Sequence, residues 1–289
     1  MSRLWLVVCG LVLGFVVSCA PSSKNQIDGR HRTGIINGSD VKEGDPIEAS
    51  IVAIYNVQEK YLCTGSLITP NVVMTAAHCI GQQATDLRIL FTNDIDHTTA
   101  DHVLRATDAR TNPRWKVHHQ DQENTGDIAL IKFSGTLPAG YKPANFLSNN
   151  SILKAGTTVT MAGFGVSKVT VTPVDPKQTP DLDKQIQDGE VDCDEAKNEC
   201  IRIESSGDGI LRQTTAPIEA VRETEVVLDE THAGTCSGDS GGPAYIAQNG
   251  QYFLFGVTSR GGAACNDNGI YTNALTYARW IQDTIRTLR

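Results

Sequence analysis

Three short segments of this 289-residue chain contain the residue types that nucleophilic catalysis by an alcohol requires. Residues 75–79 (TAAHC) include His78, residues 127–130 (DIAL) begin with Asp127, and residues 238–243 (GDSGGP) include Ser240. A serine hydroxyl is a weak nucleophile near neutral pH. It needs an adjacent base, and the base needs a carboxylate to orient it. The chain supplies a His, an Asp and a Ser for these roles, in that order.

The elements around these residues are expected to be β-strands joined by turns. Residues 50–57 and 61–68 are rich in β-branched and aromatic side chains, and residues 127–133 (DIALIKF) alternate apolar positions as a half-buried strand does. The apolar run 253–258 predicts a further strand, and apolar residues at helical spacing over 277–285 predict a closing amphipathic helix. With 26 glycines and few long helical patterns, the sequence favours an all-β fold.

Composition excludes two broad classes of protein. Hydrophobic residues make up 40% of the chain and charged residues 20%, which is enough apolar surface for a core and rules out a wholly disordered chain. The net charge is −8, whereas nucleic-acid binding needs basic surfaces, so we expect no nucleic-acid partner.

The amino-terminal residues are expected to direct export. Residues 1–18 combine an early Arg3 with an apolar run that is too short to span a membrane, as in a signal peptide. The following Cys19 resembles the lipidated cysteine of bacterial lipoproteins, and the polar residues 19–34 then form a tether or propeptide. We therefore expect a lipid anchor to the membrane of the cell envelope; cleavage after Ala20 with plain secretion is the alternative.

The cysteine count agrees with export. Eight cysteines are present, of which Cys9 leaves with the signal peptide and Cys19 carries lipid. The remaining six are an even number in a chain bound for an oxidising compartment, and they permit fifteen pairings. A metal site at Cys193 and Cys200 is disfavoured because their spacing lacks a second Cys or His pair. No metal or other cofactor is expected.

At this point the chain resembles the chymotrypsin/trypsin family of serine proteases. Besides the three catalytic segments, residues 35–38 (IING) resemble the mature amino terminus of the family, and residues 63–68 (CTGSLI) resemble the strand before the base. Residues 163–165 (GFG) and 257–261 (VTSRG) resemble the start of the second barrel and the strand that pairs with substrate. The resemblance implies an all-β fold of two six-stranded antiparallel β-barrels with a carboxyl-terminal α-helix.

The resemblance also implies domain boundaries. The protease domain spans 35–289, with a first barrel over about 35–150, a second over about 151–275, and a helix over 276–288. Residues 166–208 interrupt the second barrel with prolines and an acidic run, and we interpret them as a surface insertion. A solvated acidic face is favoured there over a calcium loop, because the Asp-x-Asp-x-Asp-Gly order is absent.

Catalytic roles are carried over residue by residue. Ser240 attacks the scissile carbonyl, His78 takes and returns its proton, and Asp127 orients His78. The backbone N–H groups of Gly238 and Ser240 form the oxyanion hole. The resemblance implies the disulfides Cys63–Cys79 and Cys236–Cys265, and we expect Cys193–Cys200 to close a small loop within the insertion.

Activation departs from the family pattern. In relatives a freed Ile amino group pairs with the Asp before the nucleophile, which here implies Ile35 and Asp239. Relatives have Arg or Lys directly before that Ile, whereas Gly34 stands here and Arg32 lies further back. We therefore expect a zymogen that an activating protease cuts at Gly34–Ile35, directly or with later trimming.

The resemblance to the family also predicts which residues form the substrate pocket. Gly234 occupies its base, where trypsin-like enzymes carry an Asp that receives Arg or Lys, and Gly261 and Gly269 occupy its walls. An open, uncharged pocket predicts large apolar or aromatic side chains before the scissile bond, with Asp267 as an alternative source of a basic preference. Ser259 and Arg260 complete the substrate-binding set; Arg260 stands where relatives have Trp.

The sequence thus predicts an exported serine endopeptidase acting on protein or peptide substrates. The alternative is a catalytically silent binding protein on the same fold at the cell surface.

Overall fold

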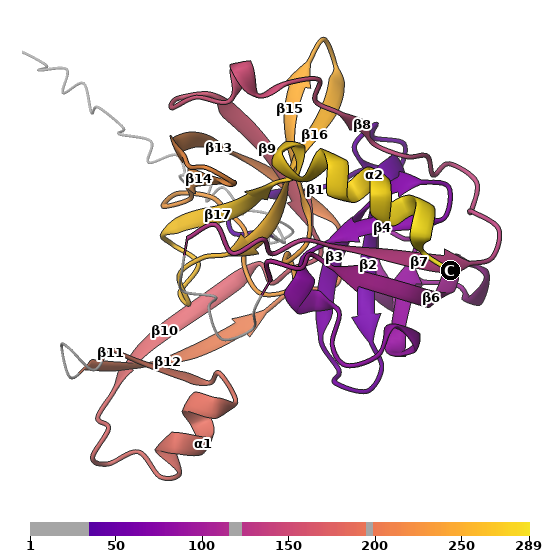
Figure 1. Ribbon diagram of the computed structural model, residues 1–289. Coiled ribbons are helices and arrows are strands. Elements are labelled where there is room, and N and C mark those ends of the chain that lie inside the picture. The colour runs from indigo at the N-terminus through magenta and orange to yellow at the C-terminus, as the bar shows by residue number, and fades with distance from the viewer. Residues whose placement is uncertain (1–34, 116–122, 195–198) are drawn as a thin grey trace, which may run out of the picture. The chain divides into compact units, whose positions relative to one another are not determined.

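The computed structural model describes residues 35–115, 123–194 and 199–289 (Figure 1). The expected signal peptide, Cys19 and the tether over 19–34 lie outside these residues. None of the described helices is both long and apolar enough to cross a membrane.

Six strands form the first barrel, closed in the order β2-β3-β4-β7-β6-β5 with antiparallel pairing throughout. They are β2 (Ile51–Asn56), β3 (Leu62–Thr69), β4 (Val72–Thr75), β5 (Leu87–Leu90), β6 (Val103–Thr111) and β7 (Ala129–Ser134). Ile54, Leu67, Val73 and Ile89 are fully buried in its core. Burial of each such side chain contributes about 1.5–3 kcal/mol, so these residues stabilise the closed barrel.

The second barrel runs β13-β14-β17-β16-β15-β9 and is closed by pairing of β9 with β13. Its strands are β9 (Thr158–Gly163), β13 (Arg212–Val221), β14 (Glu225–Asp229), β15 (Pro243–Gln248), β16 (Gln251–Arg260) and β17 (Asn268–Asn273). Two short strands extend it: β1 (Ser39–Asp40) pairs with β13, and β8 (Asn145–Phe146) runs parallel to β16. Val159, Phe255 and Tyr271 are fully buried in its core.

A helix closes the chain. A 3-10 turn over Ala274–Tyr277 leads into α2 (Ala278–Thr287), which buries Ile281 against the core. The Asn273 side chain accepts the Leu275 N–H at 3.1 Å and caps the start of this segment. The two antiparallel barrels and the terminal helix confirm the predicted fold class.

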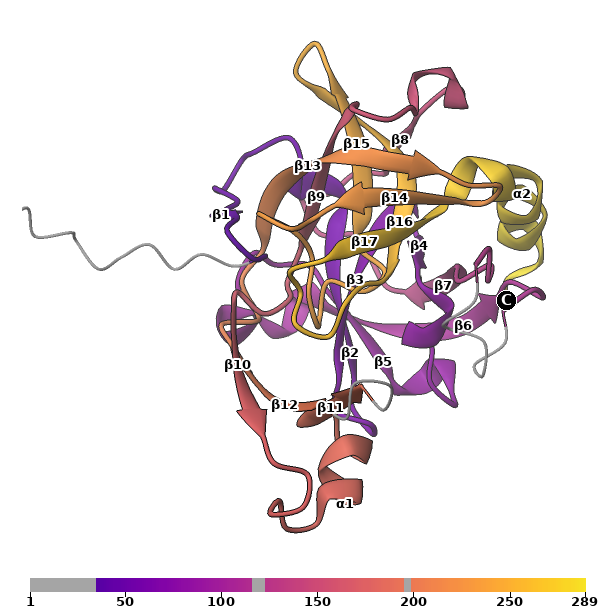
Figure 2. The same cartoon turned by 90° about the vertical axis from the view of Figure 1, so that its left-hand side faces the viewer.

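The insertion forms elements of its own, which the sequence did not predict. β10 (Lys168–Val174) pairs with β12 (Glu199–Ser206), β11 (Val191–Asp194) pairs with the other edge of β12, and α1 (Leu182–Gln187) connects β10 to β11. Both views show this three-stranded sheet projecting from the second barrel, with α1 at its far end (Figures 1 and 2). Most of its side chains are exposed, as in a surface insertion.

Candidate active site

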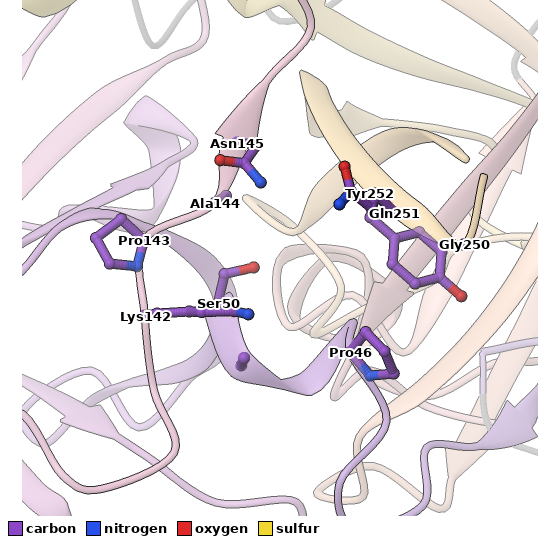
Figure 3. Close-up of a pocket in the computed structure, with 10 residues that line it drawn as sticks. Pro46, Ser50, Lys142, Pro143, Ala144, Asn145, Gly250, Gln251 and Tyr252 are labelled. Carbon is purple, nitrogen blue, oxygen red and sulfur yellow. The ribbon is translucent and has the colours of Figure 1, made fainter. Parts of the chain in front are cut away.

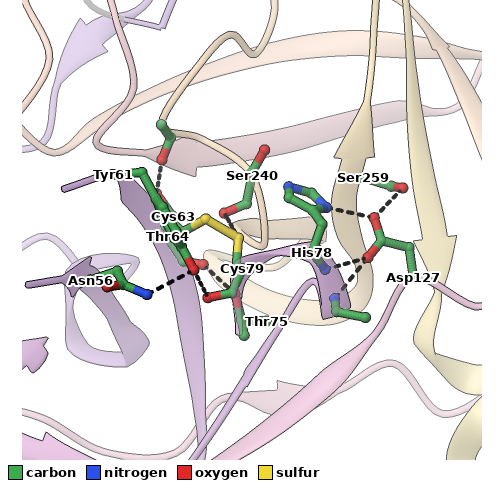
Figure 4. The surroundings of a disulfide bond; sticks show 12 residues. Asn56, Tyr61, Cys63, Thr64, Thr75, His78, Cys79, Asp127, Ser240 and Ser259 are labelled. Carbon is green, nitrogen blue, oxygen red and sulfur yellow. Dashed lines mark hydrogen bonds and ion pairs between the residues drawn. A yellow bond between two sulfur atoms is a disulfide. The ribbon is translucent and has the colours of Figure 1, made fainter. Parts of the chain in front are cut away.

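The expected base and its orienting acid come from the first barrel. His78 lies in a 3-10 turn over Ala77–Cys79 that directly follows β4, and Asp127 lies two residues before β7. Since β4 pairs with β7, both side chains reach the same end of the barrel. The His78 Nδ1 atom lies 2.8 Å from Asp127 Oδ2 (Figure 4).

Asp127 is 1% exposed, and its carboxylate accepts four hydrogen bonds. Oδ1 accepts the N–H groups of Ala77 (2.7 Å) and His78 (3.1 Å), and Oδ2 accepts the Ser259 hydroxyl (2.6 Å) besides His78. Hydrogen bonds to an ionised acceptor are about twice as strong as neutral ones, so these donors hold the carboxylate in a fixed orientation. A carboxylate fixed in this way favours the imidazole tautomer with its proton on Nδ1, which leaves Nε2 free to accept a proton.

Ser240 comes from the second barrel, in the loop before β15. The Thr64 N–H donates to its carbonyl oxygen at 2.8 Å, so β3 of the first barrel fixes this loop. That carbonyl oxygen lies 3.6 Å from Cys79 Sγ, and a ring nitrogen of His78 lies within 4.8 Å of the same disulfide sulfurs. Figure 4 shows Ser240 and His78 beside this disulfide. Among the described residues, no hydrogen bond joins the Ser240 hydroxyl to the imidazole; such bonds are often long in unliganded enzymes.

The backbone around Ser240 has the form of an anion-binding loop. Gly238 and Gly241 have φ of +95° and +81°, and a Cβ on Gly241 would lie 1.9 Å from Thr75 Oγ1. Within the described ranges, the N–H groups of Gly238 and Ser240 donate to no other group. These two free donors, one of them on the nucleophile itself, have the composition of an oxyanion hole. Removing one donor of an oxyanion hole costs about 3–4 kcal/mol of transition-state stabilisation.

Asp239 points away from the cleft into the protein. Its carboxylate is fully buried and accepts the N–H groups of Cys236 (2.9 Å) and Gly165 (2.7 Å). Burial raises the pKa of Asp239 to about 7, although these hydrogen bonds act in the opposite direction. A Cβ on Gly165 would lie 2.4 Å from Oδ2, which explains the glycine in the Gly-Phe-Gly segment. In this uncut chain the carboxylate is thus held by backbone donors.

Ile35, the expected new amino terminus, is fully buried in the uncut chain. Its φ is +43°, which is rare and strained for a β-branched residue. The next residue forms an isolated antiparallel bridge with Gly234, whose N–H donates to the Ile36 carbonyl at 3.1 Å. The segment therefore already lies along the chain that precedes the nucleophile.

A cavity of about 170 Å³ opens beside Ser240. It brings together three of the predicted pocket residues, Ser259, Arg260 and Gly261, with the disulfide Cys236–Cys265. The other two predicted residues, Gly234 and Gly269, do not line it directly. They lie on either side of the Glu230 side chain, which the sequence did not single out.

Arg260 forms a buried ion pair that the sequence did not predict. Its guanidinium donates from Nη1 and Nη2 to the two carboxylate oxygens of Glu225 at 2.9 and 3.0 Å. Glu225 is fully buried. Desolvation alone would raise the pKa of Glu225, but the hydrogen bond and charge of Arg260, with nearby backbone donors, hold it below its usual value. The Arg260 side chain is thus directed along the wall of the site by a partner on β14.

A smaller hollow adjoins the base. It is lined by His78, Asp127, Ser259, Arg260 and Trp115, and the Trp115 ring lies 6.3 Å from the imidazole ring. Trp115 packs against the core and also forms a wall of this hollow.

The structure contains the three expected disulfides, Cys63–Cys79, Cys193–Cys200 and Cys236–Cys265. Within the described ranges, the only group of three clustered metal-ligand side chains is Cys63, His78 and Cys79. Two of these are joined in a disulfide and the third is the expected base, so the group does not have the composition of a metal site.

A separate cavity of about 100 Å³ lies between the first barrel and the β15–β16 hairpin (Figure 3). Lys142 and Tyr252 are the only ionisable side chains on its wall. It contains none of the predicted site residues and lacks a nucleophile–base pair, so we assign it no catalytic role.

Sequence reasoning missed two residues: Thr64 had no local signal, and Glu230 had only a weak one. Thr64 donates from Oγ1 to the Gly238 carbonyl at 2.9 Å, a contact between residues 174 positions apart. Glu230 lies near the pocket glycines only because β14 pairs with β17. The acidic residue four positions before Gly234 was a weak signal that could have been noticed.

One comparison with known proteins bears on this arrangement. The family model described as Trypsin matches residues 35–281, which include both barrels and the start of α2.

Proposed function

This chain belongs to the trypsin family of serine proteases, and we propose that it is a serine endopeptidase in which Ser240, His78 and Asp127 are the catalytic residues. The observation that carries the proposal is the buried Asp127 carboxylate bonded to His78 Nδ1 beside the loop that presents Ser240. Protein or peptide substrates follow from membership of the family.

The reaction would proceed in two acyl-transfer steps. Ser240 Oγ attacks the carbonyl carbon while His78 Nε2 accepts its proton, and the Gly238 and Ser240 N–H groups receive the developing oxyanion. His78 then returns the proton to the leaving amine, so the peptide C–N bond breaks and an acyl-enzyme remains. Water, deprotonated by His78, hydrolyses the ester and regenerates Ser240.

Labelling with a fluorophosphonate probe tests this function. We expect stoichiometric labelling of the processed protein, loss of labelling in Ser240→Ala, and unchanged labelling in a control variant of an exposed serine, Ser148→Ala. A processed, folded protein that stays unlabelled would favour the catalytically silent binding protein.

We also propose that the chain is made as a zymogen cut at Gly34–Ile35. The strained φ of Ile35 supports this site, because φ involves the preceding carbonyl carbon and the constraint disappears when that peptide bond is broken. The freed amino group would supply the cation that the buried Asp239 carboxylate lacks among its bonded partners. Amino-terminal sequencing of active protein should give Ile35; any other residue would contradict the proposal.

Export with a lipid anchor on Cys19 is proposed from the sequence. It rests on the apolar run within residues 1–18 and on the small residue before Cys19. We expect palmitate incorporation that is lost in Cys19→Ser and kept in Cys9→Ser. Incorporation that survives Cys19→Ser would leave plain secretion as the better hypothesis.

The preference for large apolar side chains stays a prediction. It depends on an uncharged pocket base, which Gly234 by itself would provide. A Cβ on Gly234 would lie 2.4 Å from Glu230 Oε2, so a carboxyl group adjoins this position and bears on the preference.

A further inference from the structure

A buried carboxyl group lies next to Thr235, a residue of the substrate cavity wall. Glu230 directly follows β14 and is 4% exposed. A Cβ on Gly234 would lie 2.4 Å from Glu230 Oε2, and a Cβ on Gly269 would lie 2.3 Å from Oε1. Both glycines therefore leave the space that this side chain fills. Their lack of side chains need not make the pocket base uncharged.

Neutral donors connect this carboxyl group to the cavity. Oε2 accepts the N–H of Thr235 at 2.8 Å and its hydroxyl at 3.0 Å, and Thr235 lines the same cavity as Ser240. The Tyr271 hydroxyl donates to Oε1 from the opposite side and lies 3.1 Å from the Thr235 hydroxyl. The carboxyl group is thus held in one orientation by residues of the cavity wall and of β17.

The Glu230 carboxyl group has no cationic partner among the described residues. Across the described parts of the chain, no Lys, Arg or His forms an ion pair with Glu230, in contrast to Glu225 with its bidentate Arg260. Burial raises the pKa of Glu230, and the hydrogen bonds from Tyr271 and Thr235 offset only part of this effect. A buried carboxylate without a cationic partner is costly, so a cation that entered the cavity would be bound strongly.

We propose that Glu230 is a specificity-determining residue whose carboxylate receives the cationic side chain of Arg or Lys before the scissile bond. The proposal rests on the endopeptidase function above and names its substrate class. Ser240 lines the cavity, and Glu230 accepts hydrogen bonds from Thr235, which lines the same cavity. A long cationic side chain would run between Ser240 and Glu230, with the guanidinium or ammonium group at the carboxylate.

Asp267 is a weaker source of a basic preference. Its Oδ1 accepts the N–H of the next residue, Asn268, at 2.6 Å, and its side chain is exposed. It lies beside Gly262, which lines the cavity, whereas the atoms nearest to a Cβ on Gly234 or Gly269 belong to Glu230. An exposed carboxylate is screened by solvent and contributes little to recognition, so Asp267 serves as the matched control for Glu230.

The test compares cleavage of peptides that differ only in the residue before the scissile bond: Arg, Lys, Phe or Leu. The enzyme is the processed protein, with its active fraction determined by fluorophosphonate titration. We expect Arg and Lys to be preferred over Phe and Leu. Glu230→Gln should lower the Arg/Phe ratio of kcat/KM by about 30-fold or more, as for loss of a buried charge pair, while Asp267→Asn should change it less than about threefold.

Binding of benzamidine, compared with its neutral analogue benzamide, gives a second readout that does not depend on folding of a variant. The wild-type enzyme should be inhibited by the amidinium far better than by the amide. Equal inhibition, or a titrated enzyme that prefers Phe, would overturn the role of Glu230 while leaving the endopeptidase function standing. Failure of the wild-type protein to react with the fluorophosphonate would instead refute the function itself.

Discussion

Replacement of Arg260 by Met should destabilise the protein through the carboxylate that it leaves behind. Glu225 is fully buried, and its carboxylate accepts two hydrogen bonds from Arg260, at 2.9 and 3.0 Å, and one from the Thr125 N–H at 3.2 Å. Breaking a buried pair by removing one partner costs about 3–5 kcal/mol. The Arg260 side chain is 18% exposed, which favours the lower end of that range.

The loss should be measured by urea denaturation in a Ser240→Ala background, which prevents self-digestion. For a domain of this size, about 3 kcal/mol corresponds to a fall in Tm on the order of 10 °C. Arg222→Met is the matched control, because Arg222 lies 3.6 Å from the same carboxylate and is partly exposed. The control should cost about 1 kcal/mol or less. The double variant Glu225→Gln/Arg260→Met should recover much of the loss, since no unpaired charge remains.

The pH dependence separates charge burial from loss of packing. The pKa of Glu225 is lowered in the native protein, so the pair stabilises the fold above the unfolded-state pKa, and this contribution is lost as the pH falls through the lower native value. Without Arg260, desolvation raises the pKa of Glu225 above its unfolded value, and the resulting penalty disappears in acid. The difference between wild type and Arg260→Met should therefore be largest at pH 7 and shrink toward about pH 3. A variant as stable as wild type at pH 7, or a loss that is independent of pH, would refute this reasoning.

Three further predictions concern the loop that presents the nucleophile. Thr64→Val removes the hydroxyl that donates to the Gly238 carbonyl, so we expect kcat to fall about tenfold and the free energy of unfolding to fall by about 1–3 kcal/mol. Thr64→Ser should restore both quantities. An unchanged kcat would show that the loop keeps its shape without this hydrogen bond. Replacement of Cys236 and Cys265 by Ala opens a loop with a sequence separation of 29 residues, which increases the entropy of the unfolded chain. The free energy of unfolding, measured in urea under non-reducing conditions, should fall by about 3–4 kcal/mol. A loss below about 1 kcal/mol would contradict this entropic explanation. Burial raises the pKa of Asp239 to about 7 in the uncut chain, so its contribution to stability is present below the unfolded-state pKa and is lost as the pH rises toward 7. In the uncut Ser240→Ala protein, Asp239→Asn should therefore raise the stability relative to the parent more at pH 8 than at pH 5. The opposite order would be inconsistent with a buried, unpaired carboxyl group.

The candidate triad could be predicted from sequence because three short segments, each only suggestive alone, occur together in the order His, Asp, Ser. The strand alternation around these segments, together with the resemblance to a protease family, was sufficient to predict two β-barrels and a closing helix. The insertion was recognised by composition, but not its strands, because the pairing of β10 with β12 joins runs that are about thirty residues apart and mostly polar. The alternation of residues 168–172 (KVTVT) was a signal for a strand, but alternation does not identify the partner with which a strand pairs.

The pocket shows most clearly what the sequence could not decide. Aligned positions identified Gly234 and Gly269 as residues that leave space, and from an absent side chain the sequence predicted an uncharged base. The position of Glu230 depends on the pairing of β14 with β17 and on the path of the chain after Asp229, which brings one carboxyl group between two glycines.

The sequence by itself determined which groups of this protein can do chemistry, since a nucleophile, a base and an acid are properties of residue types. Only the tertiary structure decided which charges have partners: Glu225 is paired with Arg260, whereas in the described part of the chain Glu230 is bonded to the neutral side chains of Thr235 and Tyr271. The physical reason is that electrostatic interactions depend on distance and burial, and both are set by contacts between strands that are distant in the chain.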